Sequence, residues 1–230
     1  MIIPEHYVEL ERIYNTTLAK NIRSLAVVST FPGEGVSSII ISLAKRNALA
    51  GRTTLLVDLN IHNPQLNSQL KKAAATTKST TIKVTDFDQH ISVIRGPTGR
   101  TFILNLRKPG VLAQHIKQWL TRYDNVIIDT SPMSLKNSAN LPTEYIVGAC
   151  DGTLLTVLAG KTTNAAVATT IKKLQLVPAL LVGTVINDQF NPTLKHELLR
   201  ETRRLNKLFP KLAIKLRHWI NHNKILALEV

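Results

Sequence analysis

Cysteine, aromatic residues and long hydrophobic runs are scarce in this chain. A single cysteine, Cys150, among 230 residues excludes an internal disulfide framework and fits a reducing compartment. The apolar runs are short and interrupted, so the sequence predicts no membrane-spanning helix. The N-terminus has no basic segment followed by an apolar one, and we expect no signal peptide. These absences together favour a soluble cytoplasmic protein.

Acidic residues are also few, 15 against 29 lysines and arginines, which gives a net charge of +14. Such an imbalance favours contact with nucleic acid, anionic lipid or an acidic partner, while a merely solvated lysine-rich surface is the alternative. No helix-turn-helix or other nucleic-acid motif accompanies the charge, so binding to DNA ranks below the other hypotheses.

Apolar strands and amphipathic helices alternate along most of the chain, which predicts an α/β fold with a doubly wound, mostly parallel sheet and helices on both faces. Residues 63–100 are polar and weakly periodic, and we interpret them as a variable excursion with a short strand at 91–96. We assign residues 1–192 to this domain and 193–230 to a basic amphipathic helical tail. The predicted strands are 24–30, 52–60, 123–132, 151–160 and 179–188, and the predicted helices are 3–20, 37–51, 110–121 and 162–175.

The segment "STFPGEGVSS" lies between the first predicted strand and the following helix, where a phosphate-binding loop belongs. Two carboxylates, Asp58 and Asp129, end later strands, and parallel sheets place ligands at this edge. With Ser37 they form a candidate Mg²⁺ site, and in an active enzyme the two aspartates would be the catalytic candidates. The candidate loop consists of Gly33, Glu34, Gly35, Val36, Ser37 and Ser38.

These motifs resemble the cytoplasmic domain of bacterial tyrosine kinases of capsule and exopolysaccharide synthesis, within the MinD/ParA/Mrp branch of P-loop proteins. The resemblance spans about residues 5–190 and includes "FPGEGVSS", "LLVDLNIH", "VIIDTSPM" and "LAGKTT". It implies a P-loop NTPase-like fold, and a place at the cytoplasmic face of the inner membrane. Glu9 and Arg12 match two positions of the family's oligomerisation pattern, whose third position is Asn15 here.

The chain departs from the family where phosphate and metal would be held. Val36 stands in place of the lysine of the first motif, Asn60 in place of the second aspartate of DxD, and His62 in place of the arginine after it. Losing such charged groups removes several kcal/mol of transition-state stabilisation, so efficient phosphoryl transfer is not expected. Weak binding of ATP or ADP with Mg²⁺ through loop amides and Ser37 stays open.

The resemblance and the departures together predict a degenerate, catalytically inactive relative of the exopolysaccharide tyrosine autokinases. Its expected partners are a polysaccharide co-polymerase or another protein of that machinery, in a homo- or hetero-oligomer. The alternatives are an active ATPase or tyrosine kinase with an atypical loop, and a ParA-like DNA-binding protein.

The tail carries nine lysines and arginines against three glutamates, with leucines, Trp219 and Ile220 at helical spacing. Three interpretations stay open: packing on its own domain, contact with an anionic membrane, or docking onto a partner. His218 and His222 are spaced for a metal on one helix face, but no further ligand accompanies them. Cys150 and Trp119 are predicted to be core residues.

Overall fold

The computed structural model describes residues 7–60, 63–64, 66, 84–88, 90–94, 100–135, 141–189, 198–202 and 210–222. The chain divides into two compact units, Met1–Asn187 and Asp188–Val230. In the described residues no helix combines the length and apolar character needed to cross a bilayer.

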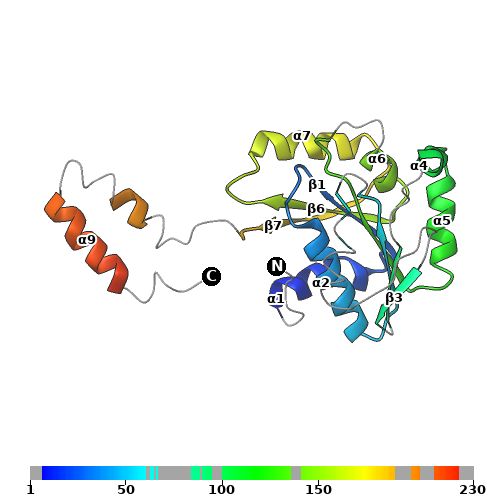
Figure 1. Cartoon of the computed structure of the whole chain (residues 1–230), viewed down its shortest axis with the longest axis horizontal. Helices are drawn as coiled ribbons and strands as arrows, with labels where there is room; N and C mark the ends of the chain where they lie inside the picture. The colour runs from blue at the N-terminus through cyan, green and yellow to red at the C-terminus, as the bar shows by residue number, and fades with distance from the viewer. Residues whose placement is uncertain are drawn as a thin grey trace. The chain divides into compact units, whose positions relative to one another are not determined.

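The first unit is built on a seven-stranded sheet in the order β3-β4-β2-β5-β1-β6-β7 (Figure 1). All neighbouring strands pair in parallel except the edge strand β3, which is antiparallel to β4. The doubly wound, mostly parallel sheet expected from the sequence is thereby confirmed. The strands are β1 (Ser24–Ser29), β2 (Thr54–Asp58), β3 (Val84–Asp88), β4 (Ile91–Ile94), β5 (Asn125–Asp129), β6 (Gly152–Leu158) and β7 (Leu181–Asn187).

Helices cover both faces of the sheet (Figure 1). Helices α1 and α2 lie on one face, and α4 to α7 lie on the other. Because side chains alternate along a strand, β1 supplies Leu25 and Val27 to the first core and Ala26 and Val28 to the second. The helices are α1 (Val8–Thr16), α2 (Val36–Leu49), α4 (Arg100–Leu106), α5 (Val111–Trp119), α6 (Thr143–Val147) and α7 (Asn164–Gln175).

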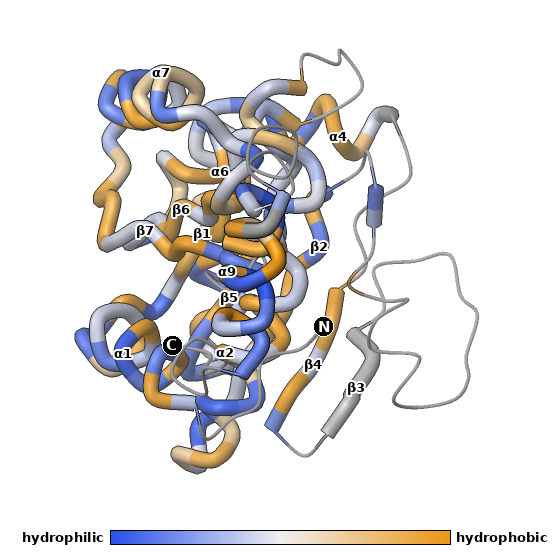
Figure 2. The backbone as a smooth tube through the Cα atoms, turned by 90° about the vertical axis from the view of Figure 1, so that its left-hand side faces the viewer, coloured by the Kyte–Doolittle hydropathy of each residue, from blue (hydrophilic) through white to orange (hydrophobic). Residues whose placement is uncertain are grey.

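Central strands β1, β2, β5 and β6 are buried along their whole length. Figure 2 shows that α7, by contrast, carries both hydrophobic and hydrophilic residues along its length. This is the pattern that a parallel sheet covered on both faces requires, because neither face of a central strand contacts water.

Three features correct the sequence expectations. The helix predicted at 3–20 ends at Thr16 and is followed by a 3₁₀ turn, Leu18–Lys20. At this break the Thr17 hydroxyl donates a hydrogen bond to the Ile13 carbonyl. The excursion predicted over 63–100 contains β3, a polar strand with no apolar alternation to reveal it. Helices α4 and α6 are too short to produce a clear period in the sequence.

A charged contact fastens α1 to α2. Arg46 of α2 forms a bidentate salt bridge with Glu11 of α1, with 3.0 Å between Nη2 and Oε2, and its guanidinium lies 4.4 Å from the centre of the Tyr14 ring. Burial of Leu10 and Tyr14 against α2 completes the junction. Because α2 begins at the candidate phosphate loop, this junction links the N-terminal helix to that loop's helix.

The second unit contains α9 (Pro210–His222) and a short helical segment at 198–202. Ala213 and Ile220 of α9 are buried, and the Arg217 guanidinium donates hydrogen bonds to the hydroxyl and the carbonyl of Thr202. The unit therefore has a small interior of its own. The helical character predicted for the tail holds for α9.

Candidate functional site

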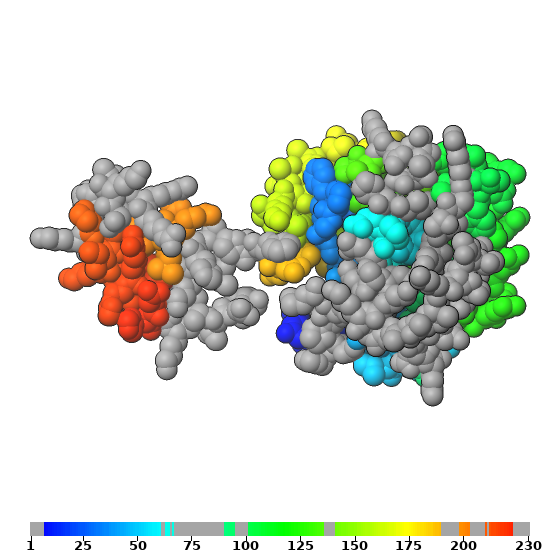
Figure 3. Space-filling model, in the orientation of Figure 1, coloured from blue at the N-terminus to red at the C-terminus, as the bar shows by residue number. Residues whose placement is uncertain are grey.

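The candidate residues converge at the carboxyl ends of three adjacent strands. The loop 30–35 follows β1, Asp58 ends β2 and Asp129 ends β5. Strands β2 and β5 pair with Asp58 directly opposite Asp129, so the two carboxylates share one level of the sheet. In Figure 3 the loop segment (blue) and the residues that follow β2 (cyan) reach the surface of one face side by side.

Two glycines give the loop its shape. Gly33 and Gly35 have φ angles of +84° and +97°, in the left-handed region that other residues rarely adopt. A Cβ atom at Gly35 would lie 2.6 Å from the Asn187 amide nitrogen, whereas one at Gly33 would meet nothing within 4 Å. The chain turns tightly here and enters α2 with Gly35 at its N-cap position.

Glu34 holds the loop in place from the inside. Its side chain is buried, and its carboxylate accepts hydrogen bonds from the Thr30 backbone N–H at 2.8 Å and from the Thr162 hydroxyl. The Asn187 amide donates to the Glu34 carbonyl at 3.1 Å. The loop after β1 is thereby connected to the segment after β6 and to the last residue of β7. The sequence identified Glu34 and the "LAGKTT" segment, but their contact spans 128 positions and had no local signal.

We expect Glu34→Gln to lower the free energy of unfolding by about 1–2 kcal/mol. The glutamine oxygen can still accept from the Thr30 N–H, and the Thr162 hydroxyl can turn to accept from the amide, but both hydrogen bonds lose the carboxylate charge that strengthens them. Urea unfolding measures the change. Glu9→Gln on the exposed face of α1 serves as the control and should change stability by less than about 0.5 kcal/mol. Equal effects of the two variants would contradict the role assigned to Glu34.

Val36 occupies the position between Gly35 and Ser37 at which the resembling motif has lysine. Its side chain is 8% exposed and belongs to the hydrophobic core between the sheet and helices α1 and α2. An apolar side chain is satisfied in that environment and offers no charge to a phosphate. Valine in place of the motif's lysine therefore packs into the hydrophobic core at this position.

Ser37 and Asp129 form the polar centre of the site. The Ser37 hydroxyl donates to the Asp129 carboxylate at 2.7 Å, and the other Asp129 oxygen, Oδ1, is buried with no hydrogen-bond partner in the described part of the chain. Burial and the neighbouring Asp58 charge raise the pKa of Asp129 to about 8, and the Ser37 hydrogen bond opposes this rise. Asp129 is therefore mostly protonated near neutral pH.

Asp58 is also buried, and its carboxylate accepts from the Asn60 backbone N–H at 3.1 Å. The Asn60 side-chain oxygen faces the Ser131 hydroxyl at 3.5 Å. An amide replaces the family's second carboxylate here, so the site carries less negative charge. His62, the third departure, lies outside the described residues.

The oxygen donors of Ser37, Asp58 and Asp129 suit Mg²⁺, which prefers hard oxygen ligands, and the unpartnered Asp129 Oδ1 is a group that a cation would satisfy. A bound Mg²⁺ would neutralise the two carboxylates and displace the Asp129 proton. The phosphate side fits less well, because Val36 brings no cation and only backbone amides and Ser37 and Ser38 remain. The site thus retains a metal-type donor set beside a weakened phosphate cradle.

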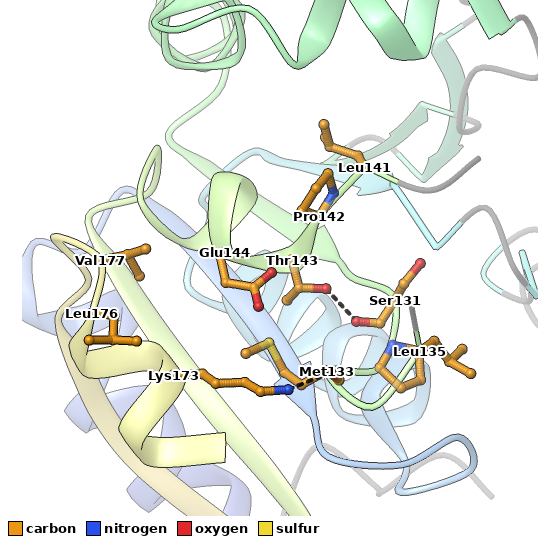
Figure 4. Close-up of a pocket in the computed structure, with 11 residues that line it drawn as sticks. Ser131, Met133, Leu135, Leu141, Pro142, Thr143, Glu144, Lys173, Leu176 and Val177 are labelled. Carbon is orange, nitrogen blue, oxygen red and sulfur yellow. Dashed lines mark hydrogen bonds between the residues drawn. The ribbon is translucent and has the colours of Figure 1, made fainter. Parts of the chain in front are cut away.

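A cavity of about 380 Å³ lies beyond Asp129, on the loop that follows β5 (Figure 4). The Lys173 ammonium donates to the Met133 carbonyl at 3.4 Å, and the Thr143 hydroxyl donates to the Ser131 carbonyl at 2.6 Å. None of the candidate metal ligands lines it. Its walls are Ser131, Pro132, Met133, Leu135, Leu141, Pro142, Thr143, Glu144, Lys173, Leu176 and Val177.

The remaining sequence candidates lie apart from this centre. Glu9 and Arg12 are exposed on α1, so they are available for the predicted assembly surface. The His218 and His222 rings lie tilted to each other with 4.1 Å between their centres, and no cluster of three metal-ligating side chains occurs among the described residues. Cys150 is buried and Trp119 packs on the core beside His115, as predicted.

Comparison with known proteins finds similar proteins for about three quarters of the chain. No protein-family model matches the chain. Tyrosine-protein kinase CpsD of Streptococcus agalactiae is 29% identical over 182 residues, which cover 73% of this chain and 75% of that protein. Tyrosine-protein kinase YwqD of Bacillus subtilis is 25% identical over 181 residues, 73% of either chain. Over about three quarters of its length the chain is similar to these bacterial tyrosine kinases.

Solved structures confirm the fold of this chain. The BceF tyrosine kinase domain superposes with a TM-score of 0.60 at 24% identity and covers 77% of this chain and 74% of its own. The kinase domain of Escherichia coli tyrosine kinase ETK gives 0.62 at 17% identity over 75% of this chain and 70% of its own. A ParA family ATPase from Chlorobium tepidum gives 0.52 at 16% identity over 87% of this chain and 99% of its own. The P-loop NTPase-like fold is thus established.

Proposed function

We propose that this bacterial tyrosine kinase relative is catalytically inactive and acts as an interaction or regulatory subunit in exopolysaccharide biosynthesis and export. It would bind a polysaccharide co-polymerase, or another protein of that machinery, at the cytoplasmic face of the inner membrane. The observation that carries the proposal is Val36, an apolar residue buried in the core at the position where the family's motif has its phosphate-binding lysine.

Electrostatics supports the loss of phosphoryl transfer. Besides burial, two groups shift the pKa of Asp129: the Asp58 carboxylate, which raises it, and the Ser37 hydroxyl, which lowers it. Neither group is a cation. A nucleotide would bring further negative charge to this centre. Phosphoryl transfer depends on cations that offset this charge, and Val36 supplies none where the family's motif has lysine.

The distribution of tyrosines supports the same proposal. The chain has four tyrosines, Tyr7, Tyr14, Tyr123 and Tyr145, and none lies in the segment 193–230. The tyrosine kinases that the chain resembles phosphorylate a cluster at the C-terminus. Residues 193–230 therefore offer no tyrosine to such a reaction.

The exposed face of α1 is a candidate surface for assembly with a second copy or with a partner protein. Glu9 and Arg12 are exposed on α1 while Leu10 and Tyr14 of the same helix are buried against the core. The helix therefore presents one charged face to a neighbour without exposing its apolar face. We assign self- or co-assembly to this face.

Titration with Mg-ATP tests the inactive-site proposal. We expect wild type to bind ATP with a Kd in the millimolar range or weaker, and Val36→Lys to bind at least about tenfold more tightly, because a charge-assisted contact to phosphate is restored. Isothermal titration calorimetry measures both constants. Val36→Met, which adds length without charge, is the matched control and should bind like wild type.

A parallel hydrolysis assay distinguishes the alternative, an active ATPase or tyrosine kinase with an atypical loop. The retained contact of Ser37 with Asp129 and the position of Asp58 opposite Asp129 favour that alternative. ATP hydrolysis or tyrosine phosphorylation by wild type that disappears in Asp129→Ala would overturn the proposal. Absence of turnover in both proteins, with Val36→Lys gaining ATP affinity, would support it.

A further inference from the structure

Helix α9 exposes an apolar strip that its own unit does not cover. Leu212 and Trp219 are each 57% exposed, and Leu216 is 36% exposed. Seven residues are close to two helical turns, so Leu212 and Trp219 project in nearly the same direction, with Leu216 between them along the helix. The residues that α9 buries, Ala213 and Ile220, lie on a different side. Figures 1 and 3 show α9 in red.

A lysine lies beside the strip on the described part of the helix. Lys215 is exposed one helical step from Leu216, and Arg217 is turned toward Thr202. Residues 193–230 carry nine lysines and arginines against three glutamates. A strip of leucines and a tryptophan beside lysines is the pattern of a helix that lies in the plane of an anionic bilayer. Tryptophan favours the headgroup region, where its ring is partly apolar and its N–H stays hydrated.

We propose that α9 binds the surface of an anionic phospholipid membrane through Leu212, Leu216 and Trp219, with Lys215 contacting the headgroups. Charge complementarity selects this occupant, because a positive unit with an amphipathic helix is attracted to a negative lipid surface. The first unit would then be held at the membrane without a membrane-spanning segment. This inference concerns the second unit and does not depend on whether the first unit binds nucleotide.

Co-sedimentation of the full chain with vesicles tests the proposal. We expect binding to vesicles of phosphatidylglycerol and phosphatidylcholine, little binding to phosphatidylcholine alone, and release by added salt. Trp219 emission should shift to shorter wavelength on binding, and the shift should be missing in Trp219→Phe. No binding to the anionic vesicles would overturn the proposal and leave packing on the first unit, or docking on a protein partner, as the role of the strip.

Matched substitutions distinguish an inserted helix from general attraction of a basic protein. Leu212→Gln should lower the partition constant by about tenfold, because one leucine no longer enters the bilayer. Ile214→Gln is the control: Ile214 is 63% exposed but lies off the strip, and its replacement should leave binding unchanged.

Charge reversal gives a second comparison at equal net charge. Lys215→Glu should lower the partition constant by about tenfold, and Lys172→Glu on the exposed side of α7 should change it by less than about twofold. Equal losses in the two lysine variants, or equal losses in the Leu212 and Ile214 variants, would refute binding through α9. Circular dichroism of each variant confirms that the fold is retained.

Discussion

The Asp129→Asn variant should be more stable than wild type at pH 8, by about 2–4 kcal/mol, in a buffer with a chelator. The wild-type carboxyl is fully buried beside Asp58, and its pKa is about 8 instead of the ordinary 3.8. The asparagine side chain carries no charge, so the protein no longer has to lose a proton from a buried site. Its oxygen still accepts from Ser37.

The pH dependence follows from the direction of the shift. Because the folded-state pKa is raised, the folded protein holds a proton that the unfolded chain releases above pH 3.8. The stability contributed by Asp129 is therefore complete below pH 3.8 and is lost as the pH rises toward 8. Each pH unit inside this window costs about 1.4 kcal/mol. The advantage of the variant should thus grow from pH 5 to pH 8 and then level off.

Urea unfolding at a series of pH values measures this dependence. Asp124→Asn is a control of opposite sign, because hydrogen bonds from the Thr53 backbone N–H and hydroxyl lower the pKa of Asp124. Its stabilising contribution is present above the unfolded pKa and is lost at acid pH, so the variant should be less stable than wild type at pH 7. A pH-independent gain in Asp129→Asn would contradict the buried, protonated state of Asp129.

Gly35→Ala should lower the free energy of unfolding by about 2–3 kcal/mol. The backbone at Gly35 has a φ of +97°, which costs an L-residue about 1–2 kcal/mol. The added methyl would also lie 2.6 Å from the Asn187 amide, so that side chain must turn away and give up its hydrogen bond to the Glu34 carbonyl. Both penalties fall on the loop that would hold a phosphate.

Gly33→Ala separates the two penalties. Gly33 has a similar φ of +84°, but a methyl there meets nothing within 4 Å, so only the backbone cost remains. Thermal or urea unfolding should therefore place Gly33→Ala between wild type and Gly35→Ala. Adding Asn187→Ala should cost less in the Gly35→Ala protein than in wild type, because the hydrogen bond is already lost. Equal stability of the two glycine variants would show that Asn187 does not constrain the loop.

The sequence alone predicts the central sheet because its strands are continuous apolar runs. Strands β1, β2, β5, β6 and β7 lie inside the predicted ranges, and α2 begins one residue before the range predicted for it. Strand β3 was not predicted, because its sequence, "VTDFD", is too polar and short to distinguish from a loop. Helices α4 and α6 depend on packing against the sheet rather than on their own periodicity.

For the candidate site too, some features could be predicted from the sequence and others only from the structure. Its members were identifiable from the sequence because each lies at a strand end or in a glycine loop, and Val36 could be read directly as a missing lysine. The placement of Asp58 opposite Asp129 and the burial that protonates Asp129 depend on strands 71 positions apart. The Glu34 contacts with Thr162 and Asn187 join residues 128 and 153 positions apart. No local pattern encodes these contacts.

The sequence by itself therefore determined the order of the main strands and helices, the resemblance of the motifs to those of bacterial tyrosine kinases, and the loss of the phosphate-binding lysine at Val36. These are properties of residue type and spacing. The tertiary structure decided how the retained groups behave. Parallel strands bring two carboxylates together in a dry environment, where desolvation and mutual repulsion favour a proton over a free charge. It also decided which apolar residues of the tail are buried and which remain exposed, since amphipathic spacing alone does not say what covers a helix face.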